Sequence, residues 1–473
     1  MADIRLGLSY DDVLLVPKKS TVYSRKDISL STKLTRNINI NIPVISANMD
    51  TVTEEKMAIA MARAGGIGIL HQFMLCDEQA DMIRRIKRSE GLMIENPYTI
   101  SEKSTVHDVN LFIKEHGRAG LIVVNDDARV LGIITARDLL FEADNGRSVT
   151  EIMTPLKDLI YEKPGISTEE AKQILKKNRI EKLPLLDNDR RIAGLITSRD
   201  IERHSKFPQS ATDDKKRLLV GAAVGVKDYM IRVPKLIEAG VDVIVVDVAH
   251  GHSVYALDAL KAIKKEFDID VIAGNIATRE AAEELISAGA DALKVGIGPG
   301  GTCKTRIVAG SGVPQITAIM DSYEIANEHG IPLIADGGIR NSGDVAKAIG
   351  AGSSSVMIGT LLAGTEESPG RFITKNGMRY KLVRGMASFT AAEARKQRQG
   401  QEKHRDVTPE GVEALVPYRG YVSEFLNDMM GGLRSGISYS GFKELRGFIG
   451  KGDFIRITPA GMKESRPHDI SEL

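Results

Sequence analysis

The run Val241-Asp-Val-Ile-Val-Val-Asp247 decides the fold, because it is the clearest of a set of apolar segments that each end in polar or glycine residues. An apolar run of this length is typical of a strand buried on both faces in a parallel sheet. Five further runs follow this pattern after residue 207, and helical patterns such as 278–289 and 342–349 separate them. They cover residues 218–225, 271–275, 292–296, 332–338 and 354–359.

Two more strands are predicted near the N-terminus, in Pro43-Val-Ile-Ser-Ala-Asn-Met-Asp50 and Gly66-Ile-Gly-Ile-Leu70. An amphipathic helix over 53–64 joins them, with Thr53 as its expected N-cap. Eight parallel strands that alternate with helices predict a (β/α)8 TIM barrel. A doubly wound open sheet is the alternative, and the absence of a GxGxxG fingerprint with an acidic residue at the expected distance disfavours it.

An internal repeat interrupts this pattern. Gly132-Ile-Ile-Thr-Ala-Arg-Asp-Leu139 recurs as Gly194-Leu-Ile-Thr-Ser-Arg-Asp-Ile201, and a polar turn precedes each copy. Duplicated units of this length predict an inserted α+β module of two repeats, over 91–206. The barrel then comprises residues 1–90 and 207–473. The threonine and aspartate of each copy are also suitable helix caps.

Composition narrows the class of protein. Lysine plus arginine (64) balances aspartate plus glutamate (63), so no strong field toward nucleic acid or an anionic membrane is expected. The two cysteines cannot form a disulfide framework, which fits a reducing compartment. No apolar run has membrane-spanning length, and the first residues lack a signal-peptide core. A cytoplasmic protein without membrane or nucleic-acid partners is expected.

The carboxyl ends of the strands should form the active site of such a barrel. The residues expected there are 48–50, 247–250, Asn275, the loop 296–306, 336–338 and 359–360. Glycines follow the last two strands, where barrels commonly hold a phosphate with backbone amides. The same glycines would also suit tight turns. Together with the glycine loop they favour a phosphorylated ligand.

The loop Gly296-Ile-Gly-Pro-Gly-Gly-Thr-Cys-Lys-Thr-Arg306 combines glycine, a thiol, a hydroxyl and two cations. Neighbouring positive charge favours the thiolate of Cys303, which is the nucleophilic form. Thr305 adds a hydroxyl two residues later. A lone cysteine is often only a small buried residue. The density of reactive groups here predicts a nucleophile loop.

This loop, with the following Arg306-Ile-Val-Ala-Gly-Ser-Gly-Val-Pro-Gln315, resembles the signature loop of the IMP dehydrogenase and GMP reductase family. The resemblance covers nearly the whole chain, and the repeats resemble a tandem CBS (Bateman) module. It implies an oxidoreductase that acts on a purine nucleotide. It also implies a homotetramer that can pair into an octamer, and an adenine or guanine nucleotide bound to the module. The module residues implied to contact that nucleotide are Thr135, Asp138, Thr197 and Asp200.

The resemblance also assigns the residues of the barrel site. Asp336 would bind the ribose; Gly338, Gly359, Thr360 and Gly301 would surround the phosphate; and Met49, Gly385, Met386 and Glu410 would complete the substrate site. Asp247, Ala249 and Asn275, with Gly296 and Gly298, would meet the nicotinamide cofactor. Potassium (K+) would be bound by Gly298, Gly300 and Cys303, and by Glu464, Ser465 and Arg466 of a neighbouring subunit.

The chemistry implied is covalent. Cys303 would add to C2 of IMP, hydride would pass to NAD, and water would then cleave the thioimidate with the help of Thr305 and Glu410. Residues 387–410 should be a mobile flap. Dehydrogenases carry an Arg-Tyr pair there, whereas this flap has no tyrosine. Arg395 or Arg398 would therefore act as the base for water.

Three functions remain in competition. IMP dehydrogenase is favoured by Asp247-Val-Ala-His-Gly-His-Ser253, the module and Glu464-Ser-Arg-Pro-His-Asp469. GMP reductase, which uses NADPH, is favoured by the missing Arg-Tyr pair, Ala47-Asn-Met-Asp50 and Gly385-Met-Ala-Ser388. A nucleotide-sensing protein without turnover is the third. Gly301 and Val383 replace a serine and a tyrosine usual in the family, so phosphate binding would depend more on backbone amides.

Overall fold

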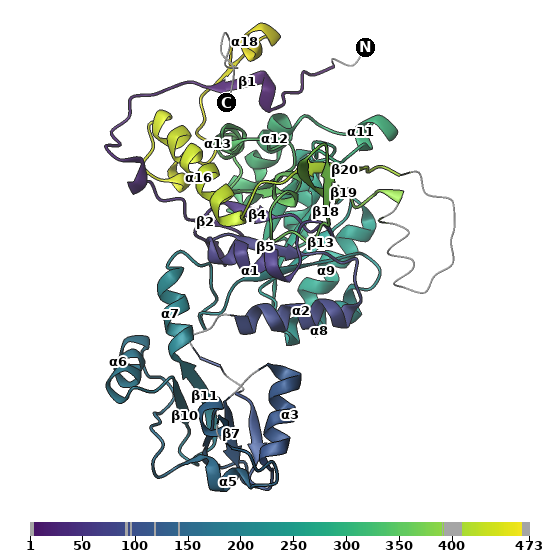
Figure 1. Cartoon of the computed structure of the whole chain (residues 1–473). Helices are drawn as coiled ribbons and strands as arrows, with labels where there is room; N and C mark the ends of the chain where they lie inside the picture. Colours follow the sequence, from purple (N-terminus) through teal and green to yellow (C-terminus); the bar gives the residue numbers. More distant parts are fainter. Residues whose placement is uncertain are drawn as a thin grey trace. The chain divides into compact units, whose positions relative to one another are not determined.

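In the computed structural model, eight short parallel strands close into a barrel (Figure 1). The structure describes residues 4–89, 93–94, 97–117, 120–140, 142–389, 391 and 409–465, and the backbone alone for 203–205. The sheet closes because β5 pairs with β12 as well as with β4. This closure confirms the predicted (β/α)8 barrel and excludes the open doubly wound sheet. Its strands are β4 (Val44–Ser46), β5 (Ile67–Leu70), β12 (Val220–Val224), β13 (Val243–Asp247), β14 (Asp270–Ile276), β15 (Ala292–Val295), β16 (Leu333–Asp336) and β17 (Ser355–Ile358).

Alternating side chains of each strand build two separate hydrophobic layers. In β13, Val243 and Val245 belong to the cluster inside the barrel, whereas Ile244 and Val246 belong to the cluster beneath the helices. This alternation follows from the two-residue period of a strand and explains why the runs are apolar throughout. The helices of the outer layer are α1 (Glu55–Arg63), α2 (Cys76–Ser89), α8 (Tyr229–Glu238), α9 (Val254–Glu266), α10 (Arg279–Ser287), α12 (Gln315–Glu328), α13 (Ser342–Ala351) and α16 (Val422–Tyr439).

The first of these helices begins later than the sequence indicates. Its N-cap is Glu54, and the Thr53 side chain is fully buried. The Thr53 hydroxyl donates to the carbonyl of Ala47 at 2.7 Å, which ties the start of the helix to the end of β4. The prediction of Thr53 as the N-cap is therefore wrong, because the Thr53 hydroxyl is hydrogen-bonded to the end of β4 and does not cap the helix.

Short strands and helices lie outside the barrel strands and the helices of the outer layer. A three-stranded antiparallel sheet, β18–β19–β20, leads into and out of the region of the predicted flap. The short strand β1 pairs with β21 near the C-terminus, and β2 pairs with β3. The elements are η1 (Tyr10–Asp12), β1 (Val13–Leu15), η2 (Arg25–Asp27), β2 (Thr32–Lys33), β3 (Asn39–Ile40), α11 (Thr305–Val308), α14 (Thr360–Ala363), β18 (Phe372–Lys375), β19 (Met378–Arg384), β20 (Glu413–Pro417), α17 (Leu445–Phe448), β21 (Phe454–Arg456) and α18 (Pro459–Glu464).

The chain divides into two units. The barrel unit comprises Met1–Ser89, Gln209–Asp213 and Leu218–Leu473, and the second unit comprises Glu90–Pro208 and Asp214–Arg217. The second unit holds the sequence repeat as two β-hairpins, β7–β8 and β10–β11. Its elements are β6 (Thr99–Ser101), α3 (Val106–His116), β7 (Leu121–Val124), β8 (Val130–Ile134), α4 (Ala136–Leu139), α5 (Val149–Ile152), β9 (Thr154–Pro155), α6 (Thr168–Asn178), β10 (Lys182–Leu186), β11 (Ile192–Thr197) and α7 (Ser198–Lys206).

The two hairpins turn by the same mechanism, which explains the polar residues repeated before each copy. Asn125 Oδ1 accepts from the amide of Arg129 at 2.9 Å, and Asp187 Oδ1 accepts from the amide of Arg191 at 2.8 Å. Side chains of this kind stabilise turns by replacing a backbone acceptor. The sequence repeat is thus a repeat of local structure.

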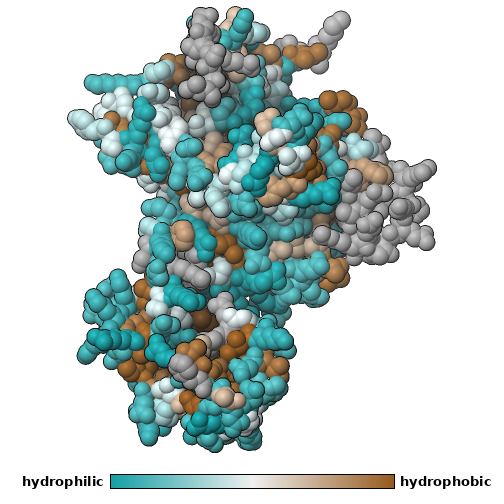
Figure 2. Space-filling view, in the orientation of Figure 1, coloured by the Kyte–Doolittle hydropathy of each residue, from teal (hydrophilic) through white to brown (hydrophobic). Residues whose placement is uncertain are grey.

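The surface differs between the two units. In Figure 2, the side chains over α2 and α8 are mostly hydrophilic, whereas brown side chains are more frequent around β7 and β10. Within the described ranges, no helix is long and apolar enough to cross a membrane.

A buried ion cluster stabilises the end of the barrel at which the strands begin. Lys87 on α2 has a side chain only 4% exposed, and its Nζ lies 3.1 Å from Asp213 Oδ2 and 2.8 Å from Asp242 Oδ1. Asp242 Oδ2 also accepts from the amide of Val220 at 2.7 Å. Burial raises the pKa of Asp242, although Lys87 opposes this. The cluster joins α2 to the first residues of β12 and β13.

Lys87→Met should lower the free energy of unfolding by about 3–5 kcal/mol, because it leaves buried carboxylates without their cation. Its loss would raise the pKa of Asp242 further. A carboxyl whose pKa is higher in the folded state loses stability as pH rises above the pKa of the unfolded chain, so the variant should be less stable at about pH 8 than at about pH 5. Urea unfolding at both pH values measures this.

The matched control is Lys235→Met, whose ammonium pairs with the exposed Asp77 at 2.6 Å. An exposed pair contributes roughly 0–1 kcal/mol, so this variant should unfold almost as the parent does. Equal losses in the two variants would show that the Lys87 cluster has no special role.

Candidate active site at the carboxyl ends of the barrel strands

The centre of the site is a buried lysine between two carboxylates. Lys294 of β15 has a side chain only 3% exposed, and its Nζ donates to Asp247 Oδ1 at 2.8 Å and to Asp336 Oδ2 at 3.0 Å. The third donor hydrogen of Lys294 goes to Asn275 Oδ1 in a short hydrogen bond. Burial alone would lower the pKa of Lys294, but the two carboxylates more than offset it and the pKa is raised. Lys294 is therefore an ammonium ion at neutral pH.

Asparagine side chains complete this network. Asn275 Nδ2 donates to Asp336 Oδ2 at 2.9 Å and to the carbonyl of Gly296 at 2.8 Å, and Asn48 Nδ2 donates to Asp247 Oδ2 at 2.8 Å. Within the described part of the chain, Asp336 Oδ1 has no hydrogen-bond donor. With side chains 20% and 22% exposed, Asp247 and Asp336 keep an accessible edge. Each can therefore accept hydrogen bonds from a bound molecule.

The loop with Cys303 forms a hydrogen-bonded chain that ends on a carboxylate. Cys303 Sγ donates to Thr305 Oγ1 at 3.2 Å, and Thr305 Oγ1 donates to Glu410 Oε2 at 2.7 Å. Lys304 N donates to the carbonyl of Glu410 at 2.6 Å, which fixes residue 410 beside the loop. Cys303 is partly exposed. This arrangement can move a proton from a thiol or a water molecule to Glu410.

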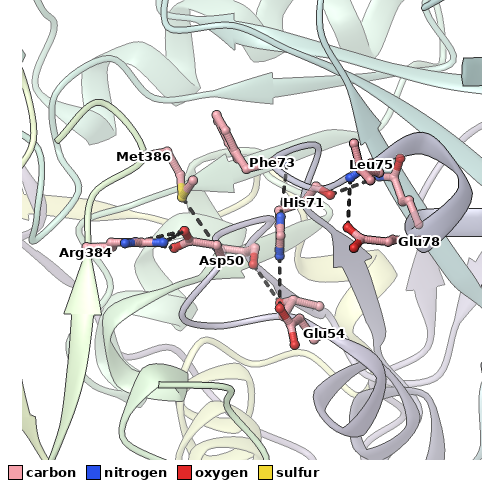
Figure 3. Close-up of polar contacts among 11 residues, drawn as sticks. Asp50, Glu54, His71, Phe73, Leu75, Glu78, Arg384 and Met386 are labelled. Atoms are coloured by element: carbon pink, nitrogen blue, oxygen red, sulfur yellow. Dashed lines mark hydrogen bonds and ion pairs between the residues drawn. The ribbon is translucent and has the colours of Figure 1, made fainter. Parts of the chain in front are cut away.

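An ion pair holds the segment after β19 against the end of β4 (Figure 3). The Arg384 guanidinium forms two hydrogen bonds to Asp50, with Nε 2.8 Å from Oδ2, and a further short contact through Nη2. Asp50 N donates to Met386 Sδ at 3.4 Å, as Figure 3 shows. The hydrogen bond to Asp50 raises the pKa of Arg384, which stays charged. Met386 is thereby fixed beside Asp50, the residue that follows Met49.

A buried histidine lies after β5, also drawn in Figure 3. His71 is fully buried, and its Nδ1 accepts from the amide of Phe73 at 3.2 Å. Nε2 lies on the other side of the ring, 3.4 Å from Glu54 Oε1. His71 supports the turn after β5, since both of its nitrogens face groups of the chain.

Glycines bring the loops of the site together. Gly337 and Gly338 have φ of +93° and +82°, a conformation that favours glycine, and a Cβ on Gly337 would lie 3.0 Å from Gly300 N. A Cβ on Gly301 would lie 3.0 Å from Thr360 Oγ1, and one on Gly359 would lie 3.0 Å from Met49 Sδ. The predicted residues of three loops therefore pack against one another around the Cys303 loop. The Thr360 hydroxyl lies beside Gly301.

The residues predicted to bind the cofactor and the metal differ in exposure and in the hydrogen bonds that they already form within the chain. Asp247 and the exposed Ala249 lie at the open end of β13, whereas both ends of the Asn275 amide bind protein groups.

Among the predicted metal ligands, the carbonyl of Gly300 accepts a hydrogen bond from Cys303 N at 3.0 Å. Glu464 ends α18, with Ser465 as its C-cap. Among the described residues, no cluster of histidine, cysteine and acidic side chains could hold a metal ion. Arg395, Arg398 and Arg466 lie outside the described residues.

In the second unit, the four residues predicted to contact a nucleotide form hydrogen bonds with each other in two pairs. Thr135 Oγ1 donates to Asp138 Oδ2 at 2.7 Å, and Thr197 Oγ1 donates to Asp200 Oδ2 at 2.6 Å. The first pair closes a capping box at the start of α4. As the structure stands, these side chains serve as the helix caps that the sequence also suggested.

The sequence did not identify Lys294, Arg384 or the buried Tyr10, whose ring lies against Gly338. Burial raises the pKa of Tyr10, with Asp344 and Asp336 adding to the effect. A signal for Lys294 was present, since a lysine inside an otherwise apolar strand needs a buried counter-charge. Arg384 gave no such signal, because its partner Asp50 is more than three hundred residues away.

Comparisons with known proteins agree with this geometry. The sequence profile described as "IMP dehydrogenase / GMP reductase domain" matches residues 7–468. The chain is 52% identical to an inosine-5'-monophosphate dehydrogenase of Nitrosopumilus maritimus, covering 99% of both chains. It is 45% identical to a GMP reductase of Leishmania donovani, covering 99% of this chain and 98% of the relative.

A solved structure is similar over the same extent. It is a GMP reductase from Trypanosoma brucei in complex with guanosine 5'-monophosphate, with a TM-score of 0.92 and 44% identity, and the match covers 99% of each chain. Both the profile and the relatives extend over the barrel strands, the Cys303 loop and the repeat unit. The chain therefore belongs to the IMP dehydrogenase / GMP reductase family of oxidoreductases.

Proposed function

We propose that the chain oxidises IMP to XMP, with NAD as the hydride acceptor, through a covalent bond between Cys303 and C2 of the purine. The observation that carries this proposal is the hydrogen-bonded series from Cys303 through Thr305 to Glu410. The relative from Nitrosopumilus maritimus, at 52% identity, is named for this activity. The product would belong to guanine nucleotide biosynthesis.

Cys303 performs the first step. As its proton passes to Thr305 and on to Glu410, the sulfur adds to C2 and a carbon–sulfur bond forms. NAD, when bound, supplies the acceptor for the hydride that leaves C2. The thioimidate on Cys303 then divides one difficult reaction into two easier ones. Asp247 and Ala249 are the residues proposed to hold the cofactor, with Asn275, Gly296 and Gly298 supporting them.

Thr305 and Glu410 serve the second step, in which water cleaves the carbon–sulfur bond. Thr305 Oγ1 donates its hydrogen to Glu410 Oε2 and so presents lone pairs to a water proton. Glu410, after releasing the first proton to solvent, receives the water proton and passes it to the departing sulfur, so the carbon–sulfur bond breaks and the thiol of Cys303 is regenerated. Arg395 or Arg398 is proposed to assist as a base, in the place of the arginine that dehydrogenases carry in their flap.

The remaining contacts follow from the loops that meet around Cys303. The open Oδ1 of Asp336 is proposed to accept from the ribose hydroxyls. Backbone amides at Gly338 and Gly359, with the Thr360 hydroxyl, would hold the phosphate beside Gly301. Met49, Gly385 and Met386 would line the base, since the Asp50–Arg384 ion pair fixes them in place.

Regulation and assembly are part of the proposal. The repeat unit is proposed to be a tandem CBS module, over 91–206, that binds an adenine or guanine nucleotide through Thr135, Asp138, Thr197 and Asp200. The assembly would be a homotetramer, able to form octamers, in the cytoplasm. Carbonyls of Gly298, Gly300 and Cys303, with Glu464 to Arg466 of a neighbouring subunit, would bind K+, because carbonyl oxygens suit a hard cation.

GMP reductase is the second candidate. The Trypanosoma brucei protein of that name matches the chain at a TM-score of 0.92, and residues 387–410 contain no tyrosine. The deciding experiment follows the absorbance of the reduced cofactor with IMP plus NAD, and separately with GMP plus NADPH. Turnover only in the second reaction would overturn the first proposal.

A nucleotide-sensing protein without turnover is the third candidate, and Cys303 distinguishes it. Cys303→Ala should abolish turnover while leaving IMP affinity within about twofold, because the side chain reacts with the base without being needed to hold it. Steady-state kinetics and calorimetry measure the two effects. In the unchanged protein, a 6-chloropurine nucleotide should label Cys303, and mass spectrometry detects the adduct. Normal rates in the alanine variant would disprove the assignment of the nucleophile.

Glu410→Gln should lower kcat by roughly 10²–10⁴-fold, because it removes the final proton acceptor. A thiol is a far stronger acid than water, so the hydrolysis step should slow more than the addition step. Rapid mixing should then show a burst of about one reduced cofactor per subunit, followed by slow turnover. A uniform slowing without a burst would place Glu410 in the first step alone. Thr305→Ala should reproduce the burst, since it breaks the same chain.

A further inference from the structure

Lys294 connects two sites that the proposed function keeps separate. Asp247 is proposed to meet the cofactor and Asp336 to meet the ribose, yet both carboxylates bind the same ammonium group, at 2.8 Å and 3.0 Å. Their oxygens are therefore close neighbours. Two carboxylates at such a separation repel each other unless a cation lies between them.

Among the described residues, no cation other than Lys294 forms a hydrogen bond or ion pair with Asp247 or Asp336. The lysine is fully buried, and all three of its hydrogens go to acceptors of the network, Asp247, Asp336 and Asn275. The other groups that touch the pair, Asn275 and Asn48, are neutral amides. Tyr10 is the further titratable group near Asp336, and because burial raises its pKa it stays uncharged at neutral pH.

We propose that Lys294 is a positioning residue for both ligands, which holds Asp247 and Asp336 as neighbouring carboxylates with one accessible edge each. The inference rests on the proposed function, because it takes the ligand of each carboxylate from there. Lys294 donates its three hydrogens to Asp247, Asn275 and Asp336, so it would act on the ligands through these side chains. It determines whether the nucleotide and the cofactor each meet an ionised acceptor.

Removing the ammonium should produce a characteristic pH dependence. In Lys294→Met the two carboxylates share a site without a cation, so one of them takes up a proton at neutral pH. IMP then meets either a protonated Asp336, which accepts ribose hydroxyls poorly, or must drive the proton onto Asp247 or into solvent, so its affinity should fall by roughly tenfold. The loss should shrink as pH rises from about 6 to about 8.5, because the carboxyl group ionises again.

Calorimetric titration of the full-length protein with IMP tests this. The ratio of the variant Kd to the parent Kd is taken at each pH, so that titration of the nucleotide itself cancels. Adding Asp247→Asn to Lys294→Met removes the repelling charge, and IMP affinity should return to within about threefold of that of Asp247→Asn alone. The KM for the cofactor should stay raised in the double variant. Lys294→Arg keeps the charge and should show a flat ratio.

Two control variants isolate the effect. Lys87→Met removes a buried ammonium from between two aspartates at the opposite end of the barrel, so it should lower stability and leave the IMP ratio flat. Asn48→Ala removes a hydrogen bond from Asp247 only, and it should raise the cofactor KM without changing IMP affinity.

The inference is overturned if Lys294→Met binds IMP within about twofold of the parent at every pH, or if Asp247→Asn fails to restore binding. The proposed function fails in a different way, since the unchanged protein would then show no reduction of NAD with IMP, whatever its affinity for the nucleotide. If the parent binds the nucleotide but the ratio of the Lys294→Met Kd to the parent Kd does not change with pH, only the proposed role of Lys294 is rejected.

Discussion

A buried positive charge at the rim of a closed barrel is the interaction on which the site depends. Parallel strands bring their carboxyl ends to one rim, and β13 and β16 each end there in an aspartate. Neighbouring carboxylates that are only a fifth exposed repel each other, so the pair needs a compensating positive charge. Lys294 of β15 supplies it from within the barrel wall. The site can therefore assemble only when the sheet closes, because the strands that carry these three residues must be in register.

The fold was predictable because its signal is local and repeated. Each apolar run reports a strand buried on both faces, and their number and alternation with helices identify the barrel. Contacts within the candidate site were predictable from the residues alone only where the partners lie close in sequence, as at Cys303 and Thr305. Lys294, Arg384 and the hydroxyl of Thr53 were missed or misassigned, because their partners are set by tertiary contact. The pairing of Thr305 with Glu410 came from family resemblance, and the structure places the two side chains in a hydrogen bond.

Different contacts fix the loops of the site in place and allow them to approach one another closely. An ion pair between Arg384 and Asp50 fixes the segment proposed to line the base, and glycines let the Cys303 loop approach its neighbours closely. Loops at the carboxyl face of a barrel can vary while the strands beneath them stay constant. Relatives that are named for two different reactions can thus share the same frame.

The insertion after β5 also has a consequence for synthesis on the ribosome. β4 pairs with β5 and with β17, which is the last strand of the barrel. The inserted unit is complete by Arg217, when six of the eight strands have not yet been made. At that stage β4 and β5 have no other barrel strand to pair with, and these apolar strands must be kept from other chains until Ile358 has emerged.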